Sequence, residues 1–185
     1  MEYLRERSLE KVNAKWLTQF LTLSFVAIFL PFFIHQQIIT GPIVNAILIL
    51  ALFLTGLRSA LLISCLPSFM ALAGGLLPTV LMPTIPFIII SNMLFVLVIN
   101  FISNKSKDSG ITGRNYFFGT LSAAAVKFVF LLVSVNIIAA FFIPGNLVAT
   151  VGKMMGIMQL LTAIIGACLA YPIVKFFQNK KSAIF

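Results

Sequence analysis

Long apolar runs alternate with short polar segments along this chain of 185 residues. A run of about 17 to 25 apolar residues is long enough to cross a lipid bilayer as an α-helix. The chain contains six runs of roughly this length, at Trp16–Ile34, Pro42–Leu57, Ser59–Leu77, Ile85–Ser103, Tyr116–Phe142 and Met154–Phe177. The pattern predicts an all-α integral membrane protein in which six transmembrane helices form one bundle.

The composition supports a membrane protein. Hydrophobic residues make up 61% of the chain and charged residues only 9%, whereas soluble proteins contain about 25% charged residues. The formal net charge of +9 comes from basic residues scattered among the short connections. Nucleic-acid-binding proteins instead gather such residues on one element or face. We therefore expect the lipid bilayer, and no nucleic acid, as a partner.

The basic residues also predict how the chain is oriented in the membrane. Alternate polar segments carry Arg5, Arg7, Lys11, Lys15, Arg58, Lys105, Lys107, Arg114, Lys175, Lys180 and Lys181. The opposite connections, at 35–41, 78–84 and 143–153, contain one basic residue, Lys153. Because cytoplasmic loops carry an excess of Lys and Arg, both termini are predicted to be cytoplasmic. The expected organisation is a cytoplasmic segment at 1–15, a transmembrane domain at 16–177 and a cytoplasmic tail at 178–185.

Two segments of this layout have more than one interpretation. Only Gly56 and Arg58 interrupt the apolar sequence between the second and third runs. These two runs therefore form either a tight helical hairpin or a re-entrant one. Segment Glu2–Lys15 is expected to form a short helix at the membrane surface, with its alternating charges in solvent. The first run is too long for a cleavable signal peptide and lacks a small-residue cleavage pattern after it.

Lys127 lies deep inside the fifth apolar run. The four acidic residues, Glu2, Glu6, Glu10 and Asp108, are all in polar segments, so no other run offers a carboxylate to neutralise it. An ionisable group at bilayer depth costs roughly 3 kcal/mol on insertion scales, and its default interpretation is a functional site. Either a ligand supplies the opposite charge, or Lys127 is neutral, extends to the interface, faces a water-filled gap or meets an acidic residue of a partner.

Four amide side chains are predicted to share the outer half of the bilayer. Converting sequence position to depth at about 1.5 Å per residue places them on four different helices, at Asn45, Asn92, Asn136 and Gln159. Single amides in membrane helices usually form interhelical hydrogen bonds. Four amides at one depth, above a lone lysine, favour a polar pocket that opens outward. Lys127 would form its floor and select an anionic ligand, most plausibly a carboxylate.

The outer connections and the small residues bear on this pocket. Residues 76–86 contain three prolines and no charge, so they are expected to interrupt the helices and form either a lid or a simple interface turn. In the sixth run, small residues recur at the spacings Ala163-x-x-x-Ala167 and Gly166-x-x-x-Ala170. Such spacings indicate close helix packing, within the bundle or against a partner.

Several mechanisms lack their usual residues in this sequence. No Asp, Glu or His lies inside an apolar run to relay protons, and no Gly-x-x-x-x-Gly-Lys-Ser/Thr loop is present to bind ATP. Cys65 and Cys168 both lie in apolar runs, so neither a disulfide framework nor a metal site is indicated. A Ser-Lys dyad of Lys127 with Ser91 or Ser122 is conceivable but disfavoured, since serine in membrane helices mostly serves packing.

The chain resembles the substrate-binding (S) components of energy-coupling-factor (ECF) transporters. The resemblance lies in its length, its six runs with both ends inside, its uncharged outer connections and its lack of an ATP-binding site. Gly41-Pro-Ile-Val-Asn45, extending to Gly56-Leu-Arg58 and followed by Pro78–Asn92, is similar in layout to small bacterial membrane proteins of that kind. The resemblance implies a vitamin-like ligand bound near the outer face. It also implies docking on a membrane coupling subunit with ATPases, in a bacterial or archaeal plasma membrane. The family's Ala-x-x-x-Ala docking signature is replaced here by Thr18-x-x-x-Thr22.

The sequence thus predicts a multi-pass uptake component of the cell membrane. It would bind a small anionic micronutrient from outside and pass it inward with an energising partner. The predicted substrate-binding residues are Asn45, Asn92, Lys127, Asn136 and Gln159. No catalytic residue, metal ligand or cofactor is expected. A structural or assembly membrane protein without a ligand, and a small intramembrane enzyme, remain as alternatives.

Overall fold

The computed structural model describes residues 14–34, 36–74, 79–105, 113–142 and 145–182. The predicted surface helix at Glu2–Lys15 therefore lies almost entirely outside the described residues. Within these ranges every regular element is helical. The elements are α2 (Ala14–Phe33), α3 (Gln37–Thr55), α4 (Leu57–Ala73), the 3₁₀-helix η1 (Thr79–Thr84), α5 (Ile85–Lys105), α6 (Gly113–Phe142), α7 (Gly145–Met155) and α8 (Ile157–Ser182). The prediction of an all-α fold is confirmed.

Six of the described helices have 17 or more residues and correspond to the six predicted runs. Four spans are long and apolar enough to cross a membrane, at Ile38–Thr55, Met82–Asn104, Gly113–Ile138 and Val151–Phe177. The other two apolar stretches, Ala14–Leu30 and Leu57–Ala73, are shorter. At about 1.5 Å per residue, the 17 residues of α4 measure about 25 Å, slightly less than a hydrocarbon core of about 30 Å.

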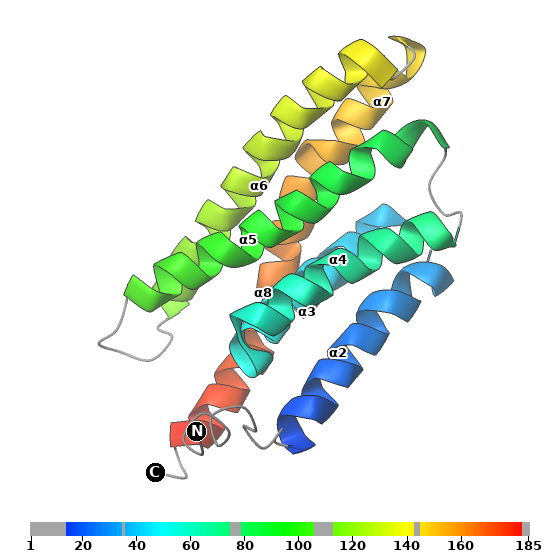
Figure 1. Cartoon of the computed structure of the whole chain (residues 1–185). Coiled ribbons are helices and arrows are strands. Elements are labelled where there is room, and N and C mark those ends of the chain that lie inside the picture. The colour runs from blue at the N-terminus through cyan, green and yellow to red at the C-terminus, as the bar shows by residue number, and fades with distance from the viewer. Residues whose placement is uncertain (1–13, 35, 75–78, 106–112, 143–144, 183–185) are drawn as a thin grey trace, which may run out of the picture.

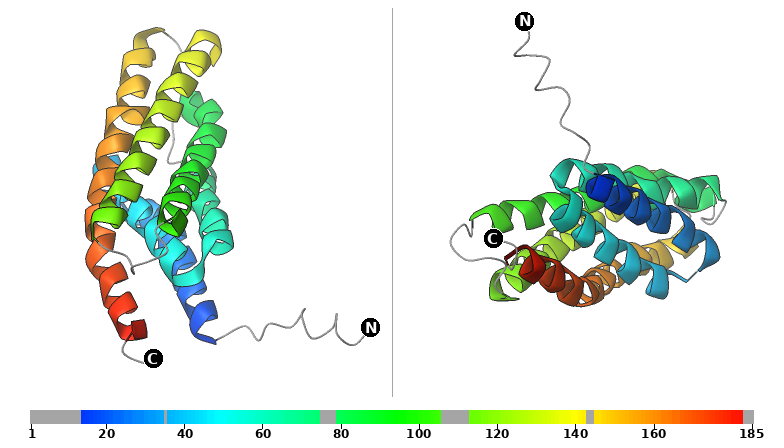
Figure 2. Two further views of the ribbon diagram at one scale, coloured as in Figure 1. Left: turned by 90° about the vertical axis from the view of Figure 1, so that its left-hand side faces the viewer. Right: turned by 90° about the horizontal axis from the view of Figure 1, so that it is seen from below.

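The six long helices form one bundle, shown in Figure 1. Helix α2 packs on α3 and α4, α5 packs on α4 and α6, and α8 packs on α3 and α6, which closes a ring. The start of α2 and the end of α8 lie at one end of this bundle, here named the proximal end (Figures 1 and 2). The opposite end is named the distal end. The sequence predicts that the proximal end is cytoplasmic.

Gly56 makes the sharp reversal between α3 and α4. Its φ of 93° is the one positive φ among the described residues, and a residue without a Cβ adopts this conformation without strain. Its N–H donates a hydrogen bond to the carbonyl of Ala51, at 3.1 Å, and so caps α3. Nearby, the indole Nε1 of Trp16 donates to the carbonyl of Thr55, at 3.0 Å, and ties the start of α2 to the end of α3. The second and third runs are therefore two helices joined by a tight turn at Gly56.

The structure corrects two of the predicted distal connections. Segment 35–41 was predicted to be a connection, but α3 begins at Gln37 and carries Pro42 inside its length. Segment 143–153 was also predicted to be a connection, but its described part from Gly145 onward is helix α7. Buried side chains of α7 recur at the helical spacing of Val151 and Met155, with Val148 packed beside them. This apolar face explains why the segment folds as a helix.

The predicted lid is described only in part. Residues 79–84 form η1, which packs against α5 and α6. Thr84 is buried at the end of η1, whereas Met82 is exposed. The segment therefore contacts the bundle at the distal end, and its function as a lid stays a prediction.

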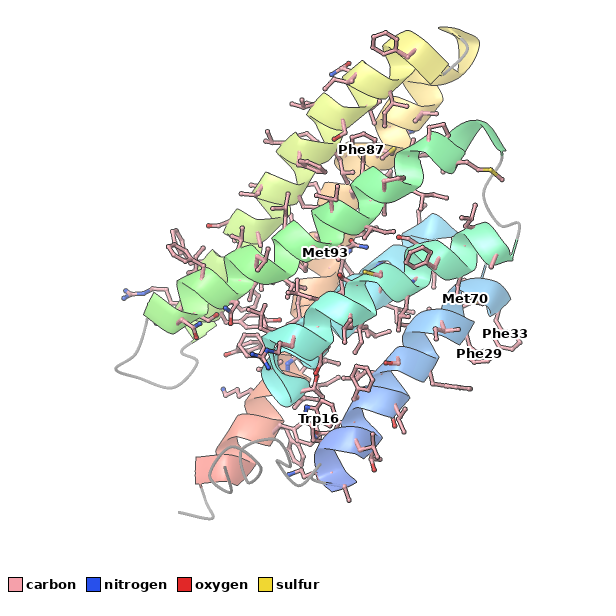
Figure 3. All side chains as sticks on the ribbon, in the orientation of Figure 1. Trp16, Phe29, Phe33, Met70, Phe87 and Met93 are labelled. Atoms are coloured by element: carbon pink, nitrogen blue, oxygen red, sulfur yellow. The ribbon has the colours of Figure 1, made fainter. Side chains whose placement is uncertain are left out.

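The bundle contains two separate hydrophobic cores. The larger one includes buried residues of α2, α3, α4, α5, α6 and α8. The smaller one lies at the distal end and consists of Leu131, Val135, Ile138, Val151 and Met155 of α6 and α7. Phe87 of α5, labelled in Figure 3, packs against this smaller core. Figure 2 shows that α6 and α7 extend past the distal ends of α3 and α4.

The outward surface of the bundle is apolar. On α2 the exposed side chains Leu17, Leu21, Phe25, Phe29 and Phe33 follow one another at four-residue spacing. Phe29 and Phe33 project from the distal end of this helix, away from the other helices (Figure 3). Neighbours at four-residue spacing lie side by side on a helix surface, so these five side chains together cover a broad strip of α2. Such a face suits lipid tails, which agrees with a membrane-embedded bundle.

Candidate functional site

Lys127 is buried in the middle of the bundle, with 2% of its surface exposed. It lies near the centre of the 30-residue helix α6. Its Nζ donates two hydrogen bonds of 2.8 Å, one to Oδ1 of Asn45 on α3 and one to Oδ1 of Asn92 on α5. The ammonium also lies 5.5 Å from the centroid of the Phe95 ring, within range of a cation–π interaction. Two neighbouring helices, α3 and α5, thus supply the groups around this charge.

The two amides are oriented by a second set of contacts. Nδ2 of Asn45 donates to the carbonyl of Gly41, at 3.0 Å, and lies 3.4 Å from Oγ1 of Thr162 on α8. The hydroxyl of Thr162 in turn donates to the carbonyl of Gln159, at 3.1 Å. Because its nitrogen is held in this way, Asn45 presents its oxygen to Lys127.

Asn92 is held more loosely than Asn45. Its Nδ2 lies 3.5 Å from the carbonyl of Ser64 on α4, at the long limit for a hydrogen bond. Both asparagines are buried, with 1% of Asn45 and 3% of Asn92 exposed. Together with Lys127 and Thr162, these contacts join α3, α4, α5, α6 and α8.

Close packing of α8 on α3 makes this arrangement possible. A Cβ added at Gly166 would lie 2.6 Å from the carbonyl oxygen of Pro42 and 2.8 Å from Cβ of Asn45. A Cβ at Gly41 would lie 2.7 Å from Cγ2 of Thr162. Neither position has room for a side chain, so both glycines allow the helices to approach at the height of Asn45. Small residues serve the same purpose in other membrane helix pairs.

The small-residue spacings of the sixth run therefore serve packing within the bundle. Ala163, Ala167 and Ala170 are buried and belong to the larger core. The hydroxyl of Tyr116 on α6 donates to the carbonyl of Ala167, at 2.7 Å, which fixes α6 against α8 on the proximal side of Lys127.

The charge of Lys127 meets only neutral groups among the described residues. None of the described residues is Asp or Glu, because Glu2, Glu6, Glu10 and Asp108 all lie outside the described ranges. Two amide oxygens and an aromatic face surround the ammonium without neutralising it. A buried cation in such a place remains costly, and an anion is the partner that would relieve the cost most.

The structure brings together three of the five predicted site residues. Asn45, Asn92 and Lys127 are in direct hydrogen-bond contact, whereas the prediction placed the amides above the lysine with a ligand between them. Gln159 is half-buried, and its described link to the cluster is its main-chain carbonyl, which accepts from Thr162. The predicted convergence is wrong for Asn136, which is exposed and donates to the carbonyl of Leu132 on its own helix, at 2.9 Å.

Helical geometry explains the position of Asn136. It follows Lys127 by nine residues on α6, and at about 100° per residue nine positions equal two and a half turns. The two side chains therefore leave opposite faces of the helix. Depth alone, on which the predicted convergence rested, does not distinguish these faces.

Neither serine of the conceivable Ser-Lys dyad contacts Lys127 through a described hydrogen bond. The hydroxyl of Ser91 donates to the carbonyl of Ile88, at 2.8 Å, and both described hydrogen bonds of Nζ go to amide oxygens. Cys65 and Cys168 are free thiols. No group of three metal-binding side chains occurs within the described ranges.

Three contributors to the site were missed in the sequence analysis: Ser64, Phe95 and Thr162. Phe95 lies three residues after Asn92 on α5, on the same helix face, so its spacing was a usable signal. Thr162 lies three residues after Gln159 on α8 in the same way. The carbonyl of Ser64 gave no signal, because its contribution comes from the main chain.

Comparisons of the chain with protein-family models, with curated proteins and with solved structures found no match.

Proposed function

We propose that this protein is a membrane uptake component that binds a small anionic molecule at Lys127. The observation that carries the proposal is a buried ammonium held by two amide oxygens and an aromatic ring. Charged residues inside membrane helices are costly, and in known cases they usually mark a substrate or ion pathway. Asn45 and Asn92 would hold Lys127 in position, and an anion would compensate its charge.

The micronutrient-like ligand and the energising partner rest on the resemblance to ECF substrate-binding components. The sequence carries no phosphate-binding loop, so uptake against a gradient would need energy from a second protein. We propose a membrane coupling subunit with ATPases as that partner, in the cell membrane of a bacterium or archaeon. The support from the described chain itself is coarser: it is a bundle with four helices long and apolar enough to span a membrane.

One observation favours a structural protein as the second candidate. The nitrogens of Asn45 and Asn92 contact protein oxygens, and their own oxygens accept from Lys127. A network satisfied in this way is what interhelical amides form when they only stabilise a bundle. In that case the protein would function by assembling with other membrane proteins, and Lys127 would be a fixed part of its core.

Native mass spectrometry of the protein purified from its own host distinguishes the two candidates. The uptake component is expected to retain an anionic small molecule, and Lys127→Met is expected to lose it while remaining folded. Lys153→Met is the matched control, because Lys153 is exposed on α7 and should not affect retention. Copurifying ATPase subunits would support the proposed partner. A stable complex without any small molecule, unchanged by Lys127→Met, would refute the uptake function in favour of the structural one.

A further inference from the structure

Lys127 is the one buried formal charge among the residues whose burial the structure describes. The other basic side chains of this group are exposed, namely Lys15, Arg58, Arg114, Lys153 and Lys175. A ligand bound at Lys127 would therefore meet a single positive charge in the bundle interior. This charge count sets a limit on the charge of the ligand.

We infer that the site accepts a singly charged anion, of the carboxylate type, and rejects doubly charged anions such as phosphate monoesters. The inference rests on the proposed function, since it specifies the ligand of the same site. One negative charge beside Lys127 forms a neutral pair. A second negative charge would have no partner among the described residues, and an uncompensated charge at this depth is strongly disfavoured.

The hydrogen-bond donors near Lys127 lead to the same conclusion. A lysine ammonium has three N–H donors, and two of them are directed at Asn45 and Asn92. One donor remains for a ligand. Doubly charged phosphate groups are usually bound by several donors at once, from arginine side chains or from a helix N-terminus.

The hydrogen bonds described for Lys127 and its two asparagines include neither of these donor types. The two described arginines, Arg58 and Arg114, are exposed near the starts of α4 and α6. Lys127 lies near the middle of α6, 14 residues after its first residue, Gly113. Asn92 is likewise seven residues after Ile85, the start of α5. The site can thus provide one charge and few donors, which suits a carboxylate.

The inference is tested with four small probes that share a methyl group: acetate, acetamide, methanesulfonate and methyl phosphate. Acetate and methanesulfonate carry one charge but differ in shape. Methanesulfonate and methyl phosphate share a tetrahedral shape, and methyl phosphate carries two charges above its second pKa of about 6. The experiment measures binding of labelled acetate to the full chain in lipid nanodiscs at pH 7, and its competition by the other three probes.

Acetate is expected to bind, and methanesulfonate to compete with it within about tenfold. Methyl phosphate should be at least about a hundredfold weaker, the ratio expected for one uncompensated charge at the bilayer centre. Acetamide should not compete. Lys127→Met should abolish acetate binding, and Lys153→Met should leave it unchanged.

The outcomes separate this inference from the proposed function. Acetate that fails to bind, or that binds Lys127→Met equally well, would refute the proposed function and the inference together. Acetate binding that depends on Lys127, with methyl phosphate competing as well as methanesulfonate, would refute the inference alone. Failure of both tetrahedral probes would show that shape selects the ligand, and would equally overturn selection by charge.

Discussion

Replacing Asn92 with Leu removes one of the two oxygens that hold the buried ammonium of Lys127. The lost hydrogen bond is 2.8 Å long, and hydrogen bonds to charged groups contribute about 1.5 to 3 kcal/mol. The second contact of Asn92, at 3.5 Å from the carbonyl of Ser64, contributes little at that length. We expect Asn92→Leu to lower the free energy of unfolding by about 2 kcal/mol.

Lys127→Met has two opposing effects. It removes a buried charge, which relieves about 3 kcal/mol. It also leaves the side-chain oxygens of Asn45 and Asn92 without their donor, at about 1 to 3 kcal/mol for each unpaired buried oxygen. The net change lies between about 1 kcal/mol of stabilisation and about 3 kcal/mol of destabilisation.

The double variant Asn92→Leu with Lys127→Met combines an absent charge with only one unpaired oxygen, that of Asn45. Relief of the buried charge and the cost of the unpaired oxygen together change the free energy of unfolding by between about 2 kcal/mol of stabilisation and zero. The double variant is therefore expected to be more stable than Asn92→Leu alone. The coupling energy between the two positions should be about 3 to 5 kcal/mol, well above the roughly 0.6 kcal/mol that is typical of neutral interhelical hydrogen bonds.

Equilibrium unfolding in mixed detergent micelles provides the measurement. The single tryptophan, Trp16, links α2 to α3 through its 3.0 Å hydrogen bond to Thr55, so its fluorescence reports separation of these helices. Asn136→Leu combined with Lys127→Met is the matched control, because Asn136 is exposed and bonded to its own helix. That pair should be additive within about 0.5 kcal/mol. Equal additivity for the Asn92 pair would refute a shared charge network.

Two further predictions concern the orientation and the packing of the bundle. A membrane-impermeant thiol reagent applied to intact cells should label Met82→Cys at the distal end and leave Lys175→Cys at the proximal end unlabelled, since both side chains are exposed; the reverse pattern would invert the predicted topology. Gly166→Ala should destabilise the bundle by about 1 to 3 kcal/mol in the same unfolding assay, because its Cβ would overlap Asn45 and the neighbouring backbone. Gly145→Ala, with no atom within 4 Å of its Cβ, should be neutral or slightly stabilising, and equal losses for both would contradict the close packing of α8 on α3.

The sequence was sufficient to predict the helices and to group Asn45, Asn92 and Lys127 together, but not the direct hydrogen bonds between them. Apolar runs of spanning length are a strong signal, and a lone charge inside one of them requires polar neighbours. Amides at matching depth are the available candidates, and two of the four predicted ones contact the lysine. For the other two amides, Asn136 and Gln159, the direction of the side chain around its helix decides whether it reaches the lysine. The nine-residue separation of Lys127 and Asn136 already contains the half-turn offset between their side chains.

Other features of the site depend on contacts between distant segments. Gly41 faces Thr162, and Gly166 faces Pro42 and Asn45. These contacts fix how closely α3 and α8 approach, and no spacing within either helix contains that information. Helix α7 was missed for a different reason. Its segment has the apolar periodicity of a helix, at Val148, Val151 and Met155, but its place between two long apolar runs predicts a connection.

The two hydrophobic cores imply that the bundle does not unfold as one unit. The distal core has only five buried side chains, all from α6 and α7, whereas the larger core draws on six helices. Regions with fewer buried contacts open at lower free energy than the whole protein. On α6, Ala124 belongs to the larger core and Leu131 to the distal one, so Lys127 lies at the boundary between the two units. Local opening of the distal unit would therefore expose the buried charge first, while the larger core stays folded.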